Sequence, residues 1–237
     1  MSDLCKWLHQ QLEQLPIINF PFKLEQLPEN GIYFFYENNE IWGHDGNKPR
    51  IVRIGTHKKG NFKSRIKEHY LWDESKMNFD RNKPKPSDRS IFRKNIGRAL
   101  PNRDNDDYSQ TWEIDFTTTE NRESLGYKRD IDKEKRTESK ITKILRQRYF
   151  FRFIIIDAQT ERMGNKGLES SLIGTVASCK LCKPSDNWLG THSSKKQIKK
   201  SGLWLVQHLK ASGINEKDKE TILNAIRRTK RWITNGV

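Results

Sequence analysis

Apolar residues recur along the chain with two different periods. Leucines four residues apart predict a helix over residues 3–14, packed on a core. Residues 31–37 (GIYFFYE) and 49–55 (PRIVRIG) are rich in aromatic and β-branched side chains and predict two strands. The Asp45-Gly46 pair between them is typical of a turn, so the pattern predicts a β-hairpin.

The pattern continues beyond the hairpin. An asparagine N-cap begins a predicted helix over 61–72. Residues 149–157 (YFFRFIIID) have the strongest strand pattern in the chain, and a helix is predicted over 165–179. Residues 202–209 fit a strand or a helix. A basic amphipathic helix is predicted over 217–233.

Residues 73–148 differ in character, because they are highly charged. We expect an insertion with its own contacts and not a disordered segment. It contains helical patterns over 90–100 and 131–148, and residues 107–120 could form a strand. The chain then divides into three parts: an N-terminal helix and connector (1–28), a central domain with the insertion (29–190) and a basic helical C-terminal extension (191–237).

Charge narrows the class of function. The chain of 237 residues carries a formal net charge of +15 and a pI of about 9.7. Such an excess creates a field that attracts polyanions, so nucleic acid is the first candidate partner, ahead of an anionic membrane surface. No apolar run approaches the roughly 20 residues of a membrane-spanning helix, and the N-terminus does not resemble a secretion signal. We therefore expect no membrane association.

The cysteines point to a reducing compartment. Three cysteines do not make a disulfide framework, so a cytoplasmic location is expected. Cys179 and Cys182 have the Cys-x-x-Cys spacing of zinc sites, but structural zinc needs four ligands. Cys5 and His192 are the only loose additions that the sequence suggests. Two ordinary thiols are therefore favoured over zinc.

A series of short motifs gives the sharpest functional signal. In chain order they are Gly31-Ile32-Tyr33, Arg53-Ile54-Gly55, Arg65 with His69, Glu169 and Asn187. In this order the chain resembles the GIY-YIG nuclease family, over roughly residues 29–72 and 150–190. Each residue alone has an ordinary structural interpretation, and only the joint order favours a nuclease-derived site.

The resemblance implies an α+β fold, with a small central antiparallel or mixed sheet of about three strands flanked by helices. It also implies that Glu169 binds one divalent cation, Mg²⁺ or Mn²⁺, through hard oxygen ligands. Asn187 matches the asparagine that commonly follows this carboxylate in the family.

The same resemblance suggests roles for the other residues. Tyr33 would position the attacking water and accept its proton. Arg65 and His69 share a helix face, where Arg65 could hold phosphate and His69 could orient Tyr33 or shuttle a proton. Arg53 replaces the family's second tyrosine and stays protonated, so it could contact phosphate or lower the pKa of Tyr33.

The predicted partner is double-stranded DNA. Lysines beside the motifs and in the basic tail are candidate phosphate contacts: Lys58, Lys59, Lys63, Lys195 and Lys196. One active site cuts one strand, so a double-strand cut suggests a homodimer or sequential nicking.

The leading hypothesis is a Mg²⁺-dependent DNA endonuclease. An elaborated module with no obvious helicase or repair partner resembles the type II restriction enzymes of the family, and a phage-defence nuclease is close behind. Because of Arg53, the alternative is a catalytically inactive nucleic-acid-binding module on the same scaffold. A basic subunit of a larger assembly is the third interpretation.

Overall fold

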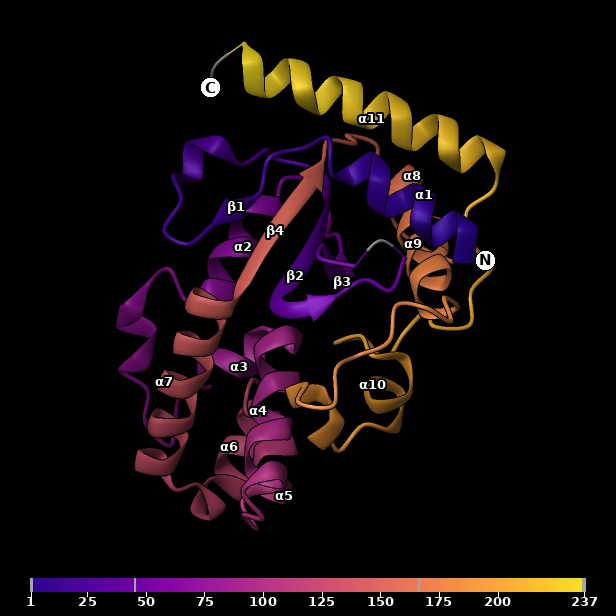
Figure 1. The fold of residues 1–237 in the computed structure, drawn as a ribbon. Coiled ribbons are helices and arrows are strands. Elements are labelled where there is room, and N and C mark those ends of the chain that lie inside the picture. Colours follow the sequence, from indigo (N-terminus) through magenta and orange to yellow (C-terminus); the bar gives the residue numbers. More distant parts are fainter. Residues whose placement is uncertain (1, 45, 166, 236–237) are drawn as a thin grey trace.

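The structure is a computed structural model that describes residues 2–44, 46–165 and 167–235. A four-stranded antiparallel sheet lies at its centre, in the order β1-β4-β2-β3 (Figure 1). The strands are β1 (Ile18–Asn19), β2 (Ile32–Ile41), β3 (Pro49–Gly55) and β4 (Tyr149–Ile154). The predicted α+β class is confirmed, and the short β1 is the strand beyond the three expected.

The predicted hairpin is present as β2 and β3. Tyr33 pairs with Gly55 and Phe35 with Arg53 across it. Gly46 has a positive φ of 69°, as its turn position requires, whereas Asp45 lies outside the described residues. Successive side chains of β2 point to opposite faces, and both faces are buried, which explains why the strand reads as a continuous apolar run.

One face of the sheet packs against α1 (Ser2–Leu12), α9 (Leu168–Ala177) and α11 (Glu216–Thr234). The leucine spacing of α1 places Leu8 and Leu12 in this core, where both are fully buried. The long helix α11, yellow in Figure 1, runs across the outside of α1. The helices predicted over 3–14, 165–179 and 217–233 are thus confirmed as α1, α9 and α11.

The other face packs against α2 (Phe62–Tyr70), α4 (Ile91–Arg103) and α7 (Ile131–Arg148). The helix α7 has the predicted bounds, because the Asp130 side chain accepts the Lys133 amide at its start and the strand β4 begins where it ends. Two hydrophobic clusters therefore enclose the sheet, and both contain residues of all three predicted parts of the chain.

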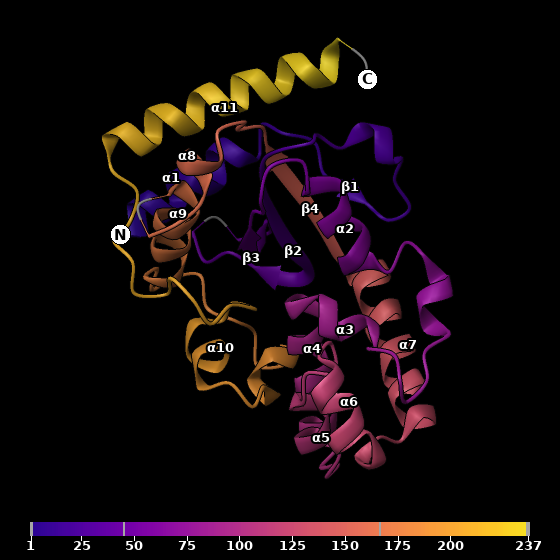
Figure 2. The same cartoon turned by 180° about the vertical axis from the view of Figure 1, so that it is seen from behind.

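The charged insertion is largely helical. Besides α4 and α7 it contains η2 (Glu74–Met77), α3 (Pro86–Arg89), α5 (Ser109–Glu113), α6 (Thr119–Leu125) and η3 (Gly126–Lys128). The predicted strand over 107–120 is wrong. Trp112 on α5 buries its ring against Gly97, and the Thr118 hydroxyl accepts the Asn121 amide to begin α6. These side-chain contacts stabilise helices where a strand was expected. Figure 2 shows these helices gathered at one end of the molecule, away from α11.

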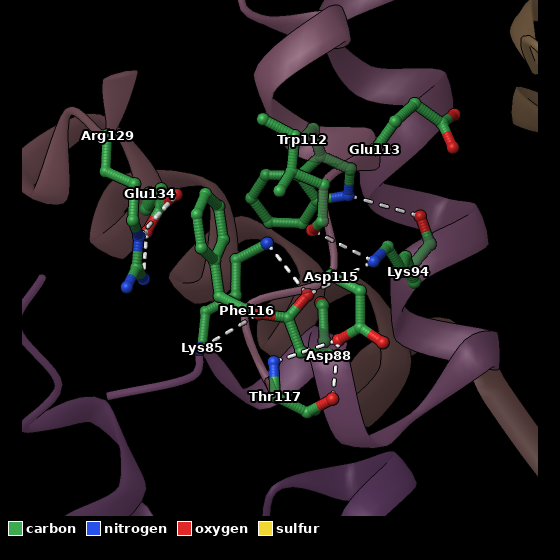
Figure 3. Close-up of polar contacts among 12 residues, drawn as sticks. Lys85, Asp88, Lys94, Trp112, Glu113, Asp115, Phe116, Thr117, Arg129 and Glu134 are labelled. Atoms are coloured by element: carbon green, nitrogen blue, oxygen red, sulfur yellow. Dashed lines mark hydrogen bonds and ion pairs between the residues drawn. The ribbon is translucent and has the colours of Figure 1, made fainter. Parts of the chain in front are cut away.

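Ion pairs explain how so charged a segment forms a core. Lys85 lies 2.9 Å from Asp88, and both side chains are fully buried (Figure 3). The Lys85 ammonium also lies 4.9 Å from the ring centre of Trp112. Arg129 is buried in the same way against Glu134, at 2.6 Å. The paired charges and aromatic faces compensate for the water that these side chains lose on burial. An unpaired buried charge would lack this compensation.

The segment 202–209 is neither the predicted strand nor a helix. Gly202, with a φ of 69°, ends α10 (Lys196–Ser201). The Trp204 amide then donates to the Val52 carbonyl at 2.8 Å. The remaining elements are η1 (Leu24–Gln26), α8 (Gln159–Arg162) and η4 (Leu189–His192).

Candidate active site

Tyr33 and Gly55 form the centre of the candidate site. A Cβ atom added to Gly55 would lie 2.4 Å from the Tyr33 hydroxyl, so only glycine leaves room for the ring at this cross-strand position. The tyrosine is 3% exposed, and its hydroxyl lies 3.1 Å from Nε2 of His69. The first and second half-motifs are therefore complementary parts of one packing arrangement.

His69 connects Tyr33 to the helical insertion. Its Nδ1 lies 2.8 Å from Oγ of Ser90, the residue whose hydroxyl caps α4 by accepting the Arg93 amide. Burial, followed by the charges of Arg53, Arg65 and Arg93, lowers the pKa of His69 well below 6.5. The imidazole of His69 is therefore neutral at pH 7.

Arg53 lies on the same face of the sheet as Tyr33. Its Nη1 donates to the Trp204 carbonyl at 2.6 Å, and its guanidinium lies 5.0 Å from the ring centre of Phe92. Burial raises the pKa of Tyr33, and the charges of Arg53 and Arg65 lower it, with burial prevailing. The expected influence of Arg53 is present, but Tyr33 remains a neutral phenol at pH 7.

Arg65 lies one turn before His69 on α2. Its Nη1 is paired with the Glu68 carboxylate and donates to the Arg89 carbonyl at 3.2 Å. Its side chain is partly exposed, with an accessible fraction of 22%. The arginine is thus held at the rim of the site and retains contact with solvent.

Glu169 lies in the first turn of α9 and faces the end of β3. Its Oε1 accepts the Thr56 amide at 3.1 Å, directly after Gly55. Burial raises the pKa of the Glu169 carboxyl, while this hydrogen bond and the charges of Arg53 and Arg162 lower it, with burial prevailing. Its Oε2 accepts no hydrogen bond from the described part of the chain. This oxygen and the hard donor chemistry of a carboxylate suit a divalent cation.

Arg162 is a site residue that the sequence did not suggest. Its Nη1 donates to Thr56 Oγ1 at 2.7 Å and to the His57 carbonyl at 2.6 Å. The Thr56 hydroxyl in turn donates to the Gly31 carbonyl at 2.7 Å. Thr56 and His57 could have been found by their position directly after the second half-motif, but nothing in the sequence around Arg162 distinguishes it.

Asn187 lies apart from this group. It is exposed, and within the described ranges no hydrogen bond joins it to Tyr33 or Glu169. Its neighbour Trp188 donates to Glu37 at 3.0 Å. Glu37 is four residues along β2 from Tyr33, a separation of about 13 Å.

The candidate DNA-binding lysines lie in two places. Lys58 and Lys59 are exposed in the loop after β3, next to His57. Lys63 pairs with Glu29 at 2.9 Å, and Lys195 pairs with Glu113 at 3.3 Å. Lys196 is exposed at the start of α10. The loop after β3 is therefore the basic segment closest to the candidate site.

Comparison with known proteins decides the family. A family model described as a GIY-YIG domain matches residues 3–232. The chain belongs to the GIY-YIG family. This GIY-YIG match includes the insertion and most of the C-terminal segment, and membership implies nuclease, hence hydrolase, activity. Neither the search of curated proteins nor that of solved structures found a match.

The structure corrects the interpretation of the cysteines in this GIY-YIG protein. Of the two further ligands that the sequence suggested, Cys5 lies close to Cys179 and Cys182. The fourth member of the group is His44 and not His192. This group is separate from the Tyr33–Glu169 site.

Among the described residues, no helix is long and apolar enough to cross a membrane.

Proposed function

We propose that this GIY-YIG protein is a metal-dependent DNA endonuclease that hydrolyses phosphodiester bonds, with Glu169 as the metal-binding carboxylate. The observation that carries this proposal is the hydrogen bond from the Thr56 amide to Glu169. It joins the second half-motif to the carboxylate helix, on the strand end where Gly55 accommodates Tyr33. All the motifs except Asn187 therefore come together in space, which supports the proposal.

Glu169 would hold Mg²⁺ or Mn²⁺ through its Oε2. When bound, such an ion supplies Lewis-acid stabilisation of phosphate charge and of the leaving oxygen. The Thr56 amide fixes the other carboxylate oxygen and so sets the direction in which Oε2 points. Burial raises the pKa of Glu169, so the ionisation of this carboxyl depends on nearby positive charge. Arg53 and Arg162 supply that charge.

His69 orients the Tyr33 hydroxyl. In this proposal the Ser90 hydroxyl, which accepts the Arg93 amide, donates its one hydrogen to Nδ1 of the neutral His69. The imidazole proton then lies on Nε2 and is donated to the Tyr33 oxygen. Tyr33 is left with its own hydrogen and a lone pair to position the attacking water, so it acts as a neutral hydroxyl and not as a phenolate.

Three arginines would bind the phosphate. Arg53, Arg65 and Arg162 each have a buried Nε–H without a hydrogen-bond partner among the described residues. Buried donors are normally satisfied, so three such groups around Tyr33 and Glu169 suggest an anionic ligand. Planar guanidinium groups suit phosphate oxygens. In this proposal Arg53 contributes fixed charge where the family has its second tyrosine.

DNA would approach over the loop after β3. Lys58 and Lys59 are exposed there, and a net charge of +15 favours association with a polyanion. We propose double-stranded DNA as substrate, with a restriction-type or defence role in the cytoplasm, and a homodimer for cutting both strands. Lys195, Lys196 and Asn187 would contribute only to a wider footprint that reaches α10.

The second candidate is a binding module without catalysis. Two observations favour it: Arg53 replaces a tyrosine, and Tyr33 is almost fully buried with a raised pKa. Such a module would use the same arginines and lysines to hold DNA. The two functions differ in whether divalent metal produces cleavage.

A plasmid cleavage assay with Mg²⁺ and with EDTA separates them. We expect the wild type to cleave the plasmid only with metal. Glu169→Gln should lose cleavage and retain DNA binding. Glu161→Gln on α8 is the matched control, because it removes an exposed carboxylate on the neighbouring helix and should cut normally. An intact plasmid that still shifts on a gel would favour the binding module. Cleavage by Glu169→Gln would remove Glu169 from the site.

A further inference from the structure

Four side chains converge on the face of the sheet opposite Tyr33. The ligand atoms of Cys5, His44, Cys179 and Cys182 all lie within 4.8 Å of one another. Cys5 comes from α1, His44 from the loop between β2 and β3, and the other two from the turn after α9. Three segments that are far apart in the sequence thus meet at one point.

Two of the distances in this group match the edges of a tetrahedral metal site. Zinc–sulfur bonds of about 2.3 Å and zinc–nitrogen bonds of about 2.0 Å give tetrahedral edges of about 3.8 Å between sulfurs and about 3.5 Å between sulfur and nitrogen. The Cys5 and Cys182 sulfurs are 3.7 Å apart, and the Cys179 sulfur is 3.3 Å from His44 Nε2. A disulfide would need sulfurs about 2.05 Å apart.

The hairpin loop and the turn after α9 approach each other closely. A Cβ atom on Gly43 would lie 2.0 Å from the Leu181 carbonyl oxygen, so only glycine lets the hairpin loop approach this turn. This close approach positions His44, the next residue.

His9 supports the group without joining it. Its Nδ1 donates to the Cys5 carbonyl at 2.9 Å, and its Nε2 accepts the Ile51 amide at 3.2 Å. Both ring nitrogens are therefore committed to the backbone, one to Cys5 on α1 and the other to Ile51 on β3. The imidazole fixes the helix α1 against β3 and leaves the cysteine sulfur to face the other three ligands.

We propose that Cys5, His44, Cys179 and Cys182 bind one structural zinc ion. Three thiolates and an imidazole form a soft donor set that selects zinc over the hard cations expected at Glu169. The protein supplies all four ligands, which leaves no open position for a substrate. The two metal sites lie at opposite ends of α9, since Glu169 and Cys179 are ten residues or about 15 Å of helix apart.

The position of this zinc site suggests its role. It joins α1, the hairpin loop and the end of α9, and so fixes the helix that carries Glu169 to the strands that carry Tyr33 and Gly55. Metal bonds across such long chain separations stabilise the fold in place of disulfides, which a reducing compartment does not allow. This inference is independent of the proposed nuclease activity.

The test is the zinc content of untagged, full-length protein, purified under reducing conditions and measured by elemental analysis. We expect about one zinc ion per chain, as for a closed four-ligand site. Cys182→Ser and His44→Ala should each lose most of it. His192→Ala, which removes an exposed histidine outside the group, and Glu169→Gln should retain it. Equal zinc loss in His192→Ala and His44→Ala would overturn the assignment.

A measurement on the wild type covers the case in which a variant fails to fold. Zinc-depleted wild type titrated with Co²⁺ should show the intense visible and charge-transfer bands of tetrahedral thiolate coordination, displaced by one equivalent of zinc. Weak octahedral bands, or wild type that takes up no zinc on reconstitution, would overturn the proposal. So would a Cys5–Cys182 disulfide in non-reduced peptide maps of the native protein.

Discussion

Burial changes the chemistry of individual residues in the candidate site. His69 is 1% exposed and lies among Arg53, Arg65 and Arg93, and both effects oppose its protonation. In the unfolded chain the same imidazole binds a proton near pH 6.5. The neutral histidine is therefore a property of the folded state, and it links stability to pH.

The sign of this linkage gives a prediction. Because the unfolded chain binds a proton at His69 that the folded chain does not, its contribution to stability is present above pH 6.5 and is lost as the pH falls toward the lower folded pKa. Between pH 7 and pH 5, the wild type should lose about 1–2 kcal/mol more free energy of unfolding than His69→Gln. Urea denaturation at each pH measures this difference. Exposed His192→Gln is the control, and equal acid losses in wild type and His69→Gln would contradict the prediction.

At the scale of elements, a buried ion pair joins two helices of the insertion to each other and to α2. Arg93 on α4 lies 2.7 Å from Glu138 on α7, and both side chains are fully buried. Arg93 also donates to the His69 carbonyl at 3.2 Å, at the end of α2. Three helices therefore depend on one guanidinium, and the site residue His69 depends on their arrangement.

Removing the carboxylate should therefore be costly. Glu138→Ala leaves the Arg93 charge buried and unpaired, and we expect a loss of about 3–5 kcal/mol in the free energy of unfolding. The control is Glu74→Ala, which breaks the pair with Arg146. Because Glu74 is 71% exposed, its loss should stay below about 1 kcal/mol. Chemical denaturation compares the two, and similar losses would show that Arg93 finds another partner.

At the scale of the whole molecule, charge determines association. The net charge of +15 would draw DNA to the protein, whereas the exposed lysines after β3 would fix where it binds. Charge that only steers and charge that contacts phosphate differ in their response to salt. Released counterions give a log–log slope of about −0.9 per phosphate contact.

The salt dependence of duplex binding should therefore locate the interface. We expect steep weakening with salt, and a slope smaller in magnitude by about 1.8 for the double variant Lys58→Ala/Lys59→Ala, which loses two contacts. Lys140→Ala/Lys143→Ala makes the same change in charge at exposed positions of α7 and should keep the wild-type slope. Fluorescence anisotropy at several salt concentrations measures both. Equal slopes for both double variants would place the interface elsewhere.

Local patterns in the sequence determined much of this protein. The hairpin follows from aromatic and β-branched runs, and α7 follows from a helical pattern, because both signals act between residues close in the chain. The ordered motifs indicated the family, and Gly55 could be predicted only because the motif contains it. The strand predicted over 107–120 was wrong because a local pattern contains no information on the contact between Trp112 and Gly97 on α4.

Only the tertiary structure decided what these residues do. The neutrality of His69 depends on burial under α4, and Arg162 reaches Thr56 across 106 positions of the chain. His44 joined the cysteines, and His192 did not, because Gly43 lets the hairpin loop touch the turn after α9. Spacing along the chain determines which residues share a face of a helix or strand. Metal sites and pKa values depend instead on distances between residues far apart in the sequence, which only the tertiary structure sets.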